Sequence, residues 1–306
     1  MIEEVSERDW VDFLSKKNID LSFHPDYLTS VAISFNCIVK YVFFKDKEKI
    51  NFAIAFFNKR SKVILPEHFT HNPIWINLAL SERKQLDIYL QLVKYLKSKY
   101  SKIVLKLNTN VNDIRAFKWE GFNVETRYTY IRKKGTLAHK SIESRIKKSL
   151  GSSLNVQIDD TSKDDITINV DFLKVLNFNR RKRESYLKLF SSWKEKGFLK
   201  SFSISKEKKV LGVFIVLLDK NTKKISTLMI NGADRNLDYL HATIYNEINK
   251  WSDENGFEEV DYCGANFNGI AQFKSLFYPE LKPYFLLRYS KNQNKLRFIK
   301  FLFEKL

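Results

Sequence analysis

Hydrophobic positions along the chain change their period repeatedly, from two residues to between three and four. Short apolar or alternating runs predict strands, and apolar residues at positions i, i+3, i+4 and i+7 predict helices. The longest apolar run, residues 210–218, suits a buried central strand and is far too short to span a bilayer. Because strand and helix patterns alternate from one end to the other, the sequence predicts an α/β fold.

The first half combines helices with a strand hairpin. The charged turn at residues 45–48 separates two strand patterns, which indicates the hairpin. Ser81 is a suitable N-cap for the longest helix of this half. The predicted helices are 6–17, 26–31, 81–99 and 114–119, and the predicted strands are 35–44, 49–58, 102–107 and 125–132.

The second half repeats this order of patterns. Gly256 stands where a C-cap glycine would end its long helix. The predicted helices are 170–179, 183–196, 240–255 and 270–277, and the predicted strands are 198–205, 210–218, 224–230, 259–263 and 282–287.

The repetition extends to individual residues. Ile114-Arg115-Ala116-Phe117-Lys118 matches Ile270-Ala271-Gln272-Phe273-Lys274 at an offset of 156 positions. A repeat of such a long period indicates duplication of a whole domain. We therefore expect two similar α/β domains, residues 1–135 and 140–306, with Gly135-Thr136 at the boundary.

Composition adds a strong positive charge to this picture. The 306 residues carry a formal net charge of +18, and residues 101–200 alone hold 22 basic and 11 acidic residues, a net of +11. Such a field favours anionic partners, including RNA, nucleotides, coenzyme A and phospholipid headgroups. Solvated lysine-rich faces would give the same composition, so charge does not identify the partner.

Other features limit the class of protein. The two cysteines are too few for a disulfide framework or a zinc cluster, and no His, Cys or acidic cluster has metal-ligand spacing. The acidic start of the chain lacks the positive region of a signal peptide. We therefore expect a cytoplasmic protein without a metal.

Four motifs occur in order along the chain. They are Trp119-Glu120-Gly121-Phe122, the basic run at 142–149, Arg183-Glu184-Ser185-Tyr186, and Asp261-Tyr262-Cys263-Gly264 followed by Phe273-Lys274. In this order and spacing they resemble the Fem-like transferases, whose fold is a tandem pair of acetyltransferase-like (GNAT) domains.

The resemblance implies an N-acyltransferase that forms an amide bond. An aminoacyl or acyl group would pass from aminoacyl-tRNA or an acyl-CoA, with no permanently bound cofactor, to an amine of an anionic cell-envelope or polysaccharide precursor. It also implies a catalytic site in the second domain. The resemblance gives Lys274 the catalytic role and substrate contacts to Arg145, Arg183, Tyr186, Asp261 and Phe273.

The chemistry of Lys274 agrees with that role. An amine that attacks an ester or thioester has to lose a proton, and the oxyanion that forms needs a positive charge or hydrogen-bond donors. A lysine delivered by a helix to the end of a strand can supply them. We expect Lys274→Ala to abolish transfer and to leave the fold intact.

The choice between the two acyl donors stays open. Single-domain GNAT enzymes bind the coenzyme A pyrophosphate on a glycine-rich turn that opens a helix. The equivalent segment, residues 231–238, has one glycine and two acids that would repel phosphate. This departure and the positive charge favour aminoacyl-tRNA, although the chain lacks the long helical arm that some Fem-like proteins insert.

The sequence leaves three points open, which are the role of the C-terminal segment and two functions other than catalysis. The basic amphipathic segment at 295–303 would contact the inner face of the membrane or pack back onto a domain. The duplicated fold would also suit a binding or scaffold protein that has lost its chemistry, because Lys118 repeats the Phe-Lys pair in the other half. A nonspecific RNA-binding protein is a third interpretation, based on charge alone.

Overall fold

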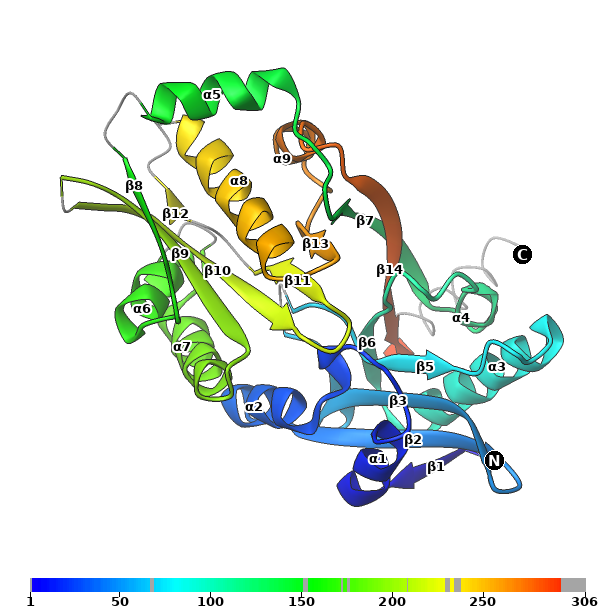
Figure 1. The fold of residues 1–306 in the computed structure, drawn as a ribbon. Helices are drawn as coiled ribbons and strands as arrows, with labels where there is room; N and C mark the ends of the chain where they lie inside the picture. Colours follow the sequence, from blue (N-terminus) through cyan, green and yellow to red (C-terminus); the bar gives the residue numbers. More distant parts are fainter. Residues whose placement is uncertain are drawn as a thin grey trace, which may run out of the picture. The chain divides into compact units, whose positions relative to one another are not determined.

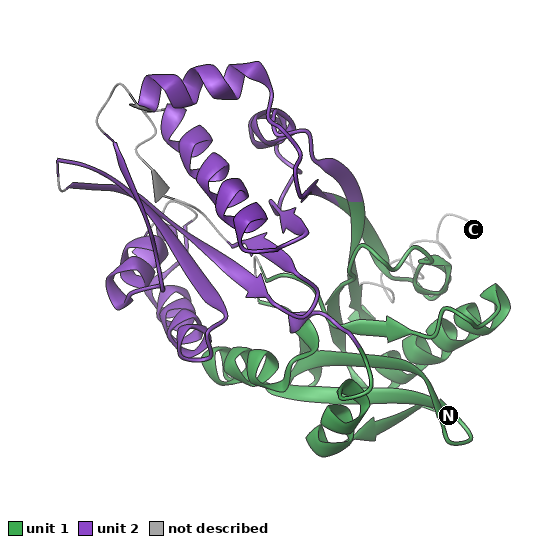
Figure 2. Ribbon diagram, in the orientation of Figure 1, with its two compact units in different colours: residues 1–17, 22–127, 283–306 green, residues 18–21, 128–282 purple. Residues whose placement is uncertain are grey.

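The computed structural model describes residues 2–66, 69–150, 154–171, 173–174, 177–207, 209–228, 232–233 and 238–292. The chain divides into two compact units (Figure 2). Unit 1 consists of Met1–Lys17, Ser22–Arg127 and Pro283–Leu306, and unit 2 of Asn18–Leu21 and Tyr128–Lys282. Each unit combines a mixed sheet with helices, so the predicted α/β class is confirmed (Figure 1).

The sheet of unit 1 has the strand order β1-β2-β3-β4-β6-β14, and β5 pairs with β3. The pair β4–β6 is parallel, and the other pairs are antiparallel. The strands are β1 (Ile2–Val5), β2 (Ile38–Asp46), β3 (Lys49–Lys59), β4 (Lys62–Ile64), β5 (Ile74–Ile76), β6 (Lys102–Lys106) and β14 (Glu280–Ser290), the last of which begins in unit 2.

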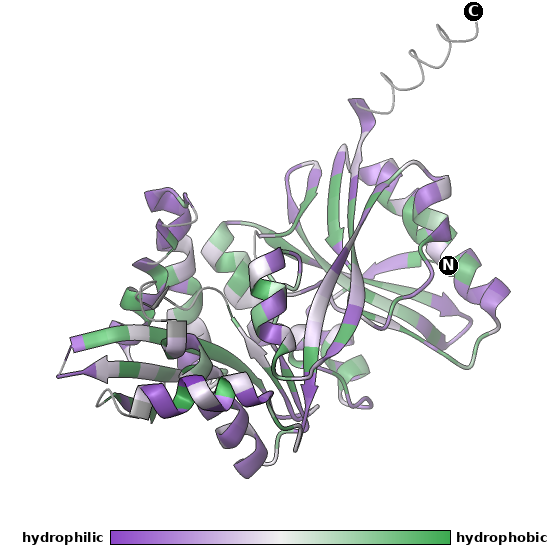
Figure 3. Ribbon diagram, turned by 90° about the horizontal axis from the view of Figure 1, so that it is seen from above, coloured by the Kyte–Doolittle hydropathy of each residue, from purple (hydrophilic) through white to green (hydrophobic). Residues whose placement is uncertain are grey.

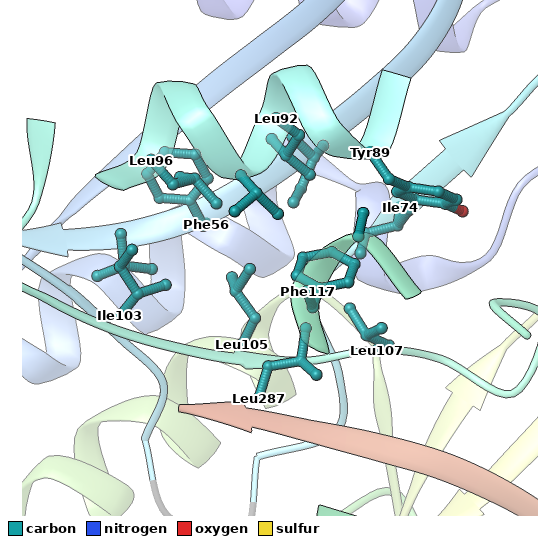
Figure 4. Packing of buried hydrophobic residues seen from close by; sticks show 14 of the residues in the cluster. Phe56, Ile74, Tyr89, Leu92, Leu96, Ile103, Leu105, Leu107, Phe117 and Leu287 are labelled. Carbon is teal, nitrogen blue, oxygen red and sulfur yellow. The ribbon is translucent and has the colours of Figure 1, made fainter. Parts of the chain in front are cut away.

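The core of unit 1 lies between α3 (Glu82–Lys99) and the sheet. Ser81 caps this helix as predicted, because its side chain accepts a hydrogen bond from the backbone N–H of Lys84. Figure 4 shows residues of α3, β3, β6, α4 and β14 meeting in this core. The other helical segments before residue 128 are α1 (Glu7–Leu14), η1 (Leu21–Phe23), α2 (Pro25–Phe35) and α4 (Arg115–Trp119).

The sheet of unit 2 has the strand order β7-β13-β11-β10-β9-β8, and β12 pairs with β10. Here the parallel pair is β11–β13. The strands are β7 (Asn123–Lys133), which begins in unit 1, β8 (Asn155–Asp159), β9 (Leu199–Lys206), β10 (Lys209–Asp219), β11 (Lys224–Thr227), β12 (Gly232–Ala233) and β13 (Glu259–Asp261). The helices are α5 (Lys140–Leu150), α6 (Lys163–Asp171), α7 (Arg180–Glu195), α8 (Asp238–Glu254) and α9 (Asn268–Ser275).

Helices cover both faces of the unit 2 sheet. Ser201 of β9 donates a hydrogen bond to Asp165 of α6, over 2.9 Å, whereas the next residue, Phe202, belongs to the core beneath α8. Because neighbouring residues of a strand point to opposite faces, α6 lies on one face and α8 on the other. The helix α7 packs with α6, and α5 packs with α8 (Figure 1). The central strands are largely hydrophobic, and the surrounding helices carry both kinds of residue (Figure 3).

The duplication predicted from the sequence is also visible in strand pairing. β3 and β10 each have 11 residues, and each receives a short additional strand at its start. Phe52 of β3 pairs with Ile76 of β5, and Gly212 of β10 pairs with Ala233 of β12. The two halves therefore repeat a topology as well as a sequence pattern.

The compact units do not follow the two halves of the sequence. Leu286 of β14 pairs with Lys106 in unit 1, and Ile131 of β7 pairs with Asp261 in unit 2. The last strand of each half thus completes the sheet of the unit built mainly from the other half. The predicted boundary at residues 135–140 concerns the duplicated halves, and for them it stays a prediction.

Some predicted elements were wrong in detail. The edge strands β1 and β8 were missed because they are short and have no continuous apolar run. The helix expected at 170–179 lies earlier, as α6. Among the described residues, no helix combines the length and apolar character needed to cross a membrane.

Candidate functional site

Lys274 is buried at the end of α9, with 7 % of its surface exposed. Its Nζ donates hydrogen bonds to three consecutive backbone carbonyls, those of Tyr262 (2.6 Å), Cys263 and Gly264 (3.3 Å). An ammonium has three N–H donors, whereas a neutral amine has two, so the three acceptors match the charged form. The site therefore holds a positive charge directly after β13.

These carbonyls converge because two parallel strands separate at this point. The ladder between β11 and β13 ends at the pair Ser226 and Asp261. Beyond it, the carbonyl of Tyr262 accepts a hydrogen bond from the Thr227 hydroxyl, over 2.8 Å. Cys263 and Gly264 then adopt positive φ angles of 49° and 59°, which turn the chain. Lys274 thus supplies hydrogen bonds that a neighbouring strand would otherwise provide.

Asp261 holds the same turn from the opposite side. Its Oδ1 accepts hydrogen bonds from the backbone N–H of Cys263, over 2.9 Å, and from the Thr129 hydroxyl, over 2.5 Å. A carboxylate that accepts from the amide two residues later forms a local turn of its own. The turn at 261–264 is therefore held by a carboxylate on its amide side and an ammonium on its carbonyl side.

Lys224 is a second cation at this end of β13, and sequence reasoning missed it. Its Nζ lies 3.6 Å from an oxygen of Asp261 and 3.9 Å from one of Glu259. Burial alone lowers the pKa of Lys224, but the nearby carboxylates of Asp261, Glu259 and Asp20 raise it above its ordinary value. No local sequence pattern indicates Lys224, because its position beside these carboxylates follows from the parallel pairing of Lys224 with Glu259.

Phe273 anchors α9 to the core beneath it. Its ring lies 5.6 Å from each of the rings of Tyr245 and Phe277, and 6.3 Å from that of His241. The structure thus brings Phe273, Lys274 and Asp261 to one strand end. For Phe273 it shows a packing role.

Arg145 lies on α5, whose two faces differ as the sequence predicts. Ile142 is buried against the core of unit 2, and the Thr243 hydroxyl of α8 donates to that of Ser149, over 2.8 Å. Arg145 is half-buried and forms no ion pair with any described residue. It therefore remains available to an anionic group, and none of the described contacts joins it to Lys274.

Arg183 and Tyr186 lie on α7, which packs with α6 on the opposite face of the sheet from α8 and α9. Tyr186 is buried, and its ring packs 5.6 Å from that of Phe178 and 6.0 Å from that of Phe190. Arg183 is half-buried and has no carboxylate partner within the described ranges. No described contact brings either residue to Lys274, because the sheet lies between the two sets of helices.

Comparison with known proteins identifies the fold that carries this site. No protein-family model and no curated protein matches the sequence. FemX, a solved structure, is 12 % identical with a TM-score of 0.63, over 98 % of this chain and 99 % of FemX. The C-terminal domain of a protein from Agrobacterium fabrum, described as a lysylphosphatidylglycerol synthetase, is also 12 % identical, with a TM-score of 0.59 over 96 % of this chain and 95 % of that one.

A third similar structure is a tandem GNAT protein from the clavulanic acid biosynthesis pathway. It is 7 % identical with a TM-score of 0.58, over 94 % of this chain and 98 % of that one. The fold is a tandem GNAT fold. This confirms the resemblance at the level of fold, over nearly the whole chain.

Two other parts of the chain could concern ligands, a predicted anion-binding segment and a surface cleft. Of the pyrophosphate-turn segment 231–238, only β12 and the start of α8 at 238 are described, so the prediction made for it lies outside the described residues. A surface cleft of about 560 Å³ in unit 1 is lined by α1, the β2–β3 turn and Trp75, and no predicted site residue contributes to it. No group of metal-binding side chains occurs within the described ranges.

Proposed function

We propose that this tandem GNAT protein is an N-acyltransferase. It transfers an aminoacyl or acyl group from an activated donor to an amine of an anionic cell-envelope or polysaccharide precursor. The observation that carries the proposal is the Lys274 ammonium at the open end of β13, in a fold similar to that of FemX over nearly the whole chain.

The reaction has two electrostatic demands at its centre. The acceptor nitrogen bonds to the carbonyl carbon of the acyl donor and loses a proton. The ester or thioester bond breaks, and the tRNA hydroxyl or the coenzyme A thiol leaves with a proton. Negative charge develops on the carbonyl oxygen before the bond breaks, and a fixed cation in a partly dry site stabilises that charge strongly. Lys274 is such a cation, and its longest hydrogen bond, the 3.3 Å contact with Gly264, is the easiest to exchange for the oxyanion.

The proposed substrate contacts lie both at the Lys274 turn and away from it. Asp261 fixes the turn that presents the carbonyls to Lys274. Arg145 and Arg183, both without described ion-pair partners, are suited to hold phosphate or carboxylate groups, and Arg183 would hold a part of a substrate remote from Lys274, because α7 lies on the other face of the sheet. The buried position of Tyr186 supports a role in holding α7, which carries Arg183.

For the acyl donor, both aminoacyl-tRNA and acyl-CoA remain in the proposal. The net charge of +18 supports aminoacyl-tRNA. Acetyl-CoA is named with the tandem GNAT protein of the clavulanic acid pathway, whose structure was determined without it. Nuclease-sensitive absorbance in the purified protein would identify tRNA, and thermal stabilisation by an acyl-CoA would identify the thioester.

The test of the proposal compares the two repeated lysines. Purified protein is incubated with each acyl donor class and a panel of amine-bearing envelope precursors, and amide products are detected by mass spectrometry. Lys274→Met should lower kcat by about 10²–10³-fold, the effect of removing one oxyanion donor in other enzymes. Lys118→Met is the control, because Lys118 occupies the corresponding position in unit 1 and is exposed, whereas Lys274 is buried.

Equal turnover by wild type and Lys274→Met, once a product has been found, would remove Lys274 from the reaction centre. A binding protein without chemistry is the alternative, and one observation favours it. All three N–H donors of Lys274 are already bonded to backbone carbonyls. In that case the protein would bind a substrate and stay inactive with every acyl donor.

The proposed place of action is the cytoplasmic side of the membrane. The C-terminal segment 295–303, which the sequence offers for membrane contact, lies outside the described residues.

A further inference from the structure

Large apolar side chains project into solvent around α9. Phe267 and Ile270 stand at its start, Tyr278 and Leu281 follow its end, and Leu137 precedes α5. Their exposed fractions run from 46 to 81 %. Single exposed hydrophobic residues are normal on a protein surface, but several gathered around one short helix indicate an interaction site.

The segments that carry these residues are in contact. The backbone N–H of His139 donates to the carbonyl of Leu276, over 2.7 Å, and the His139 ring lies 6.1 Å from that of Tyr278. Leu137 is two residues before His139, and α9 is about 12 Å long at about 1.5 Å per residue. All five side chains therefore belong to one region of unit 2, where the start of α5 meets α9 (Figure 1).

Cations continue from this apolar region along α5. The helix α5 begins directly after His139 and carries Lys140, Arg145, Lys147 and Lys148 against one acid, Glu143. None of these four cations forms an ion pair with a described residue. Exposed apolar residues beside unpaired cations are typical of proteins that bind the surface of an anionic bilayer.

We propose that the apolar residues of this region together with the cations of α5, the α5–α9 face, bind the surface of a membrane that contains anionic lipid. Phosphate headgroups would lie against the cations of α5, and the apolar side chains would leave water for the boundary of the acyl chains. A nucleic acid would satisfy the cations but offers nothing to aliphatic side chains such as Leu137, Ile270 and Leu281. The combination therefore favours lipid.

Binding at this face would bring α9, the helix that carries Lys274, to the membrane surface. An acceptor anchored in the bilayer would then present its amine close to the candidate site. The membrane proposal does not rest on the proposed chemistry, because it is measured with the protein alone and without substrate.

The experiment measures binding to vesicles of phosphatidylcholine alone and of phosphatidylcholine mixed with phosphatidylglycerol. Wild type should sediment with the mixed vesicles and stay in solution with the neutral ones. The double variant Phe267→Ser/Ile270→Ser should lower the partition coefficient about tenfold, because two apolar side chains no longer leave water. The variant Lys147→Gln/Lys148→Gln should also lower it, and added salt should mimic this second change.

The matched control is Ile33→Ser/Leu78→Ser, which removes two comparably exposed apolar side chains from unit 1. It should bind mixed vesicles like wild type. All three variants should keep the wild-type circular dichroism and melting temperature, because the substituted side chains are exposed. In Phe267→Trp, a blue shift of tryptophan emission on mixed vesicles would show entry into the apolar layer.

Four results would overturn the proposal. The first is absence of binding by wild type, and the second is equal loss in the α9 variant and the unit 1 control. The third is loss in the lysine variant alone, which would identify a purely electrostatic surface such as one for nucleic acid. The fourth is loss of self-association in Phe267→Ser/Ile270→Ser with unchanged vesicle binding, which would identify a second copy of the chain as the occupant.

Discussion

The Phe-Lys pair occurs twice in this protein, and the two copies are buried in opposite ways. In unit 1, Phe117 is completely buried in the core and Lys118 is exposed. In unit 2, Phe273 is partly buried at the edge of the core and Lys274 is buried. The more deeply buried side chain is therefore the phenylalanine in unit 1 and the lysine in unit 2, although both pairs stand on equivalent helices of a duplicated fold.

The difference arises at the ends of the parallel strands. In unit 1, the backbone N–H of Asn72 donates to the carbonyl of Lys106 over 2.8 Å, and the N–H of Lys106 donates to the Asn72 side chain over 2.9 Å. Asn72 is completely buried and closes the end of β6. In unit 2, a lysine provides the corresponding hydrogen bonds. Lys274 bonds its strand end through the side chain alone, whereas Asn72 bonds its strand end through both its backbone and its side chain.

The largest expected effect concerns the two phenylalanines. Phe117→Ala should lower the free energy of unfolding of unit 1 by about 3–5 kcal/mol, because it leaves a cavity in a closely packed core. Phe273→Ala should cost unit 2 less, about 1–2 kcal/mol, since the side chain is only partly buried. Urea unfolding followed by hydrogen exchange in each unit would measure both. A larger loss for Phe273→Ala would reverse the comparison.

The two lysines should show the opposite order. Lys274→Met should lower the free energy of unfolding of unit 2 by about 2–4 kcal/mol, because the carbonyls of residues 262–264 lose their shared donor. Lys118→Met should change unit 1 by less than about 0.5 kcal/mol, as is usual for exposed positions. The structure thus changes the expectation that Lys274→Ala leaves the fold intact. Identical urea midpoints for wild type and Lys274→Met would refute the carbonyl role.

The groups that close each strand end provide a smaller test. Asn72→Ala should destabilise unit 1 by about 1–3 kcal/mol, because the N–H of Lys106 and a carbonyl at Ala55 lose a buried partner. Thr227→Val should cost unit 2 only about 1 kcal/mol, since Lys274 still donates to the carbonyl of Tyr262. Thermal unfolding of both variants measures the difference. Equal losses would mean that Lys274 does not compensate for Thr227.

The smallest expected effect is on pH dependence. The buried Arg132 donates to both carboxylate oxygens of Asp253, over 2.8 Å each, and holds the pKa of that carboxyl below its ordinary value. A lowered folded-state pKa stabilises unit 2 above the ordinary carboxyl pKa of about 4, and this contribution is lost as the pH falls through the folded value. The free energy of unfolding of unit 2 should change through this carboxyl by at most about 1.4 kcal/mol per pH unit.

Unit 1 has its own acid-sensitive carboxylate for comparison. Hydrogen bonds from Lys99, Tyr95 and Lys40 lower the pKa of Glu4 from 4.5 to about 2. Its contribution is therefore present above pH 4.5 and is lost between that pH and about pH 2. Asp253→Asn should flatten the acid dependence of hydrogen exchange in unit 2 and leave that of unit 1 unchanged. A change in both units would show that the two do not unfold independently.

Much of the fold could be predicted because its signals are local. The apolar run at 210–218 falls within β10, and the pattern that starts at Ser81 became α3. The edge strands β1 and β8 were not predicted, because strands of four or five residues give too short a pattern to stand out from their surroundings. The exchange of β7 and β14 between the units was not predicted either, because the pairing of strands far apart in the sequence produces no periodic pattern of residues.

The candidate site could be predicted only in part. The motifs named Asp261, Phe273 and Lys274, and the structure places all three at one strand end. They also named Arg183 and Tyr186, but which face of the sheet α7 covers depends on the tertiary fold. Lys224 was missed because its proximity to Asp261 follows from the pairing of β11 with β13.

The sequence by itself determined the α/β class, the duplication and the position of Lys274 on a short helix after a strand, since periodicity and repetition are properties of neighbouring residues. The tertiary structure alone decided that Lys274 is buried and Lys118 is exposed. Two identical dipeptides on equivalent helices differ because Asn72 bonds the strand end in unit 1, whereas Lys274 itself bonds the strand end in unit 2. Every buried carbonyl needs a donor, and where that donor comes from depends on which segments the fold brings together.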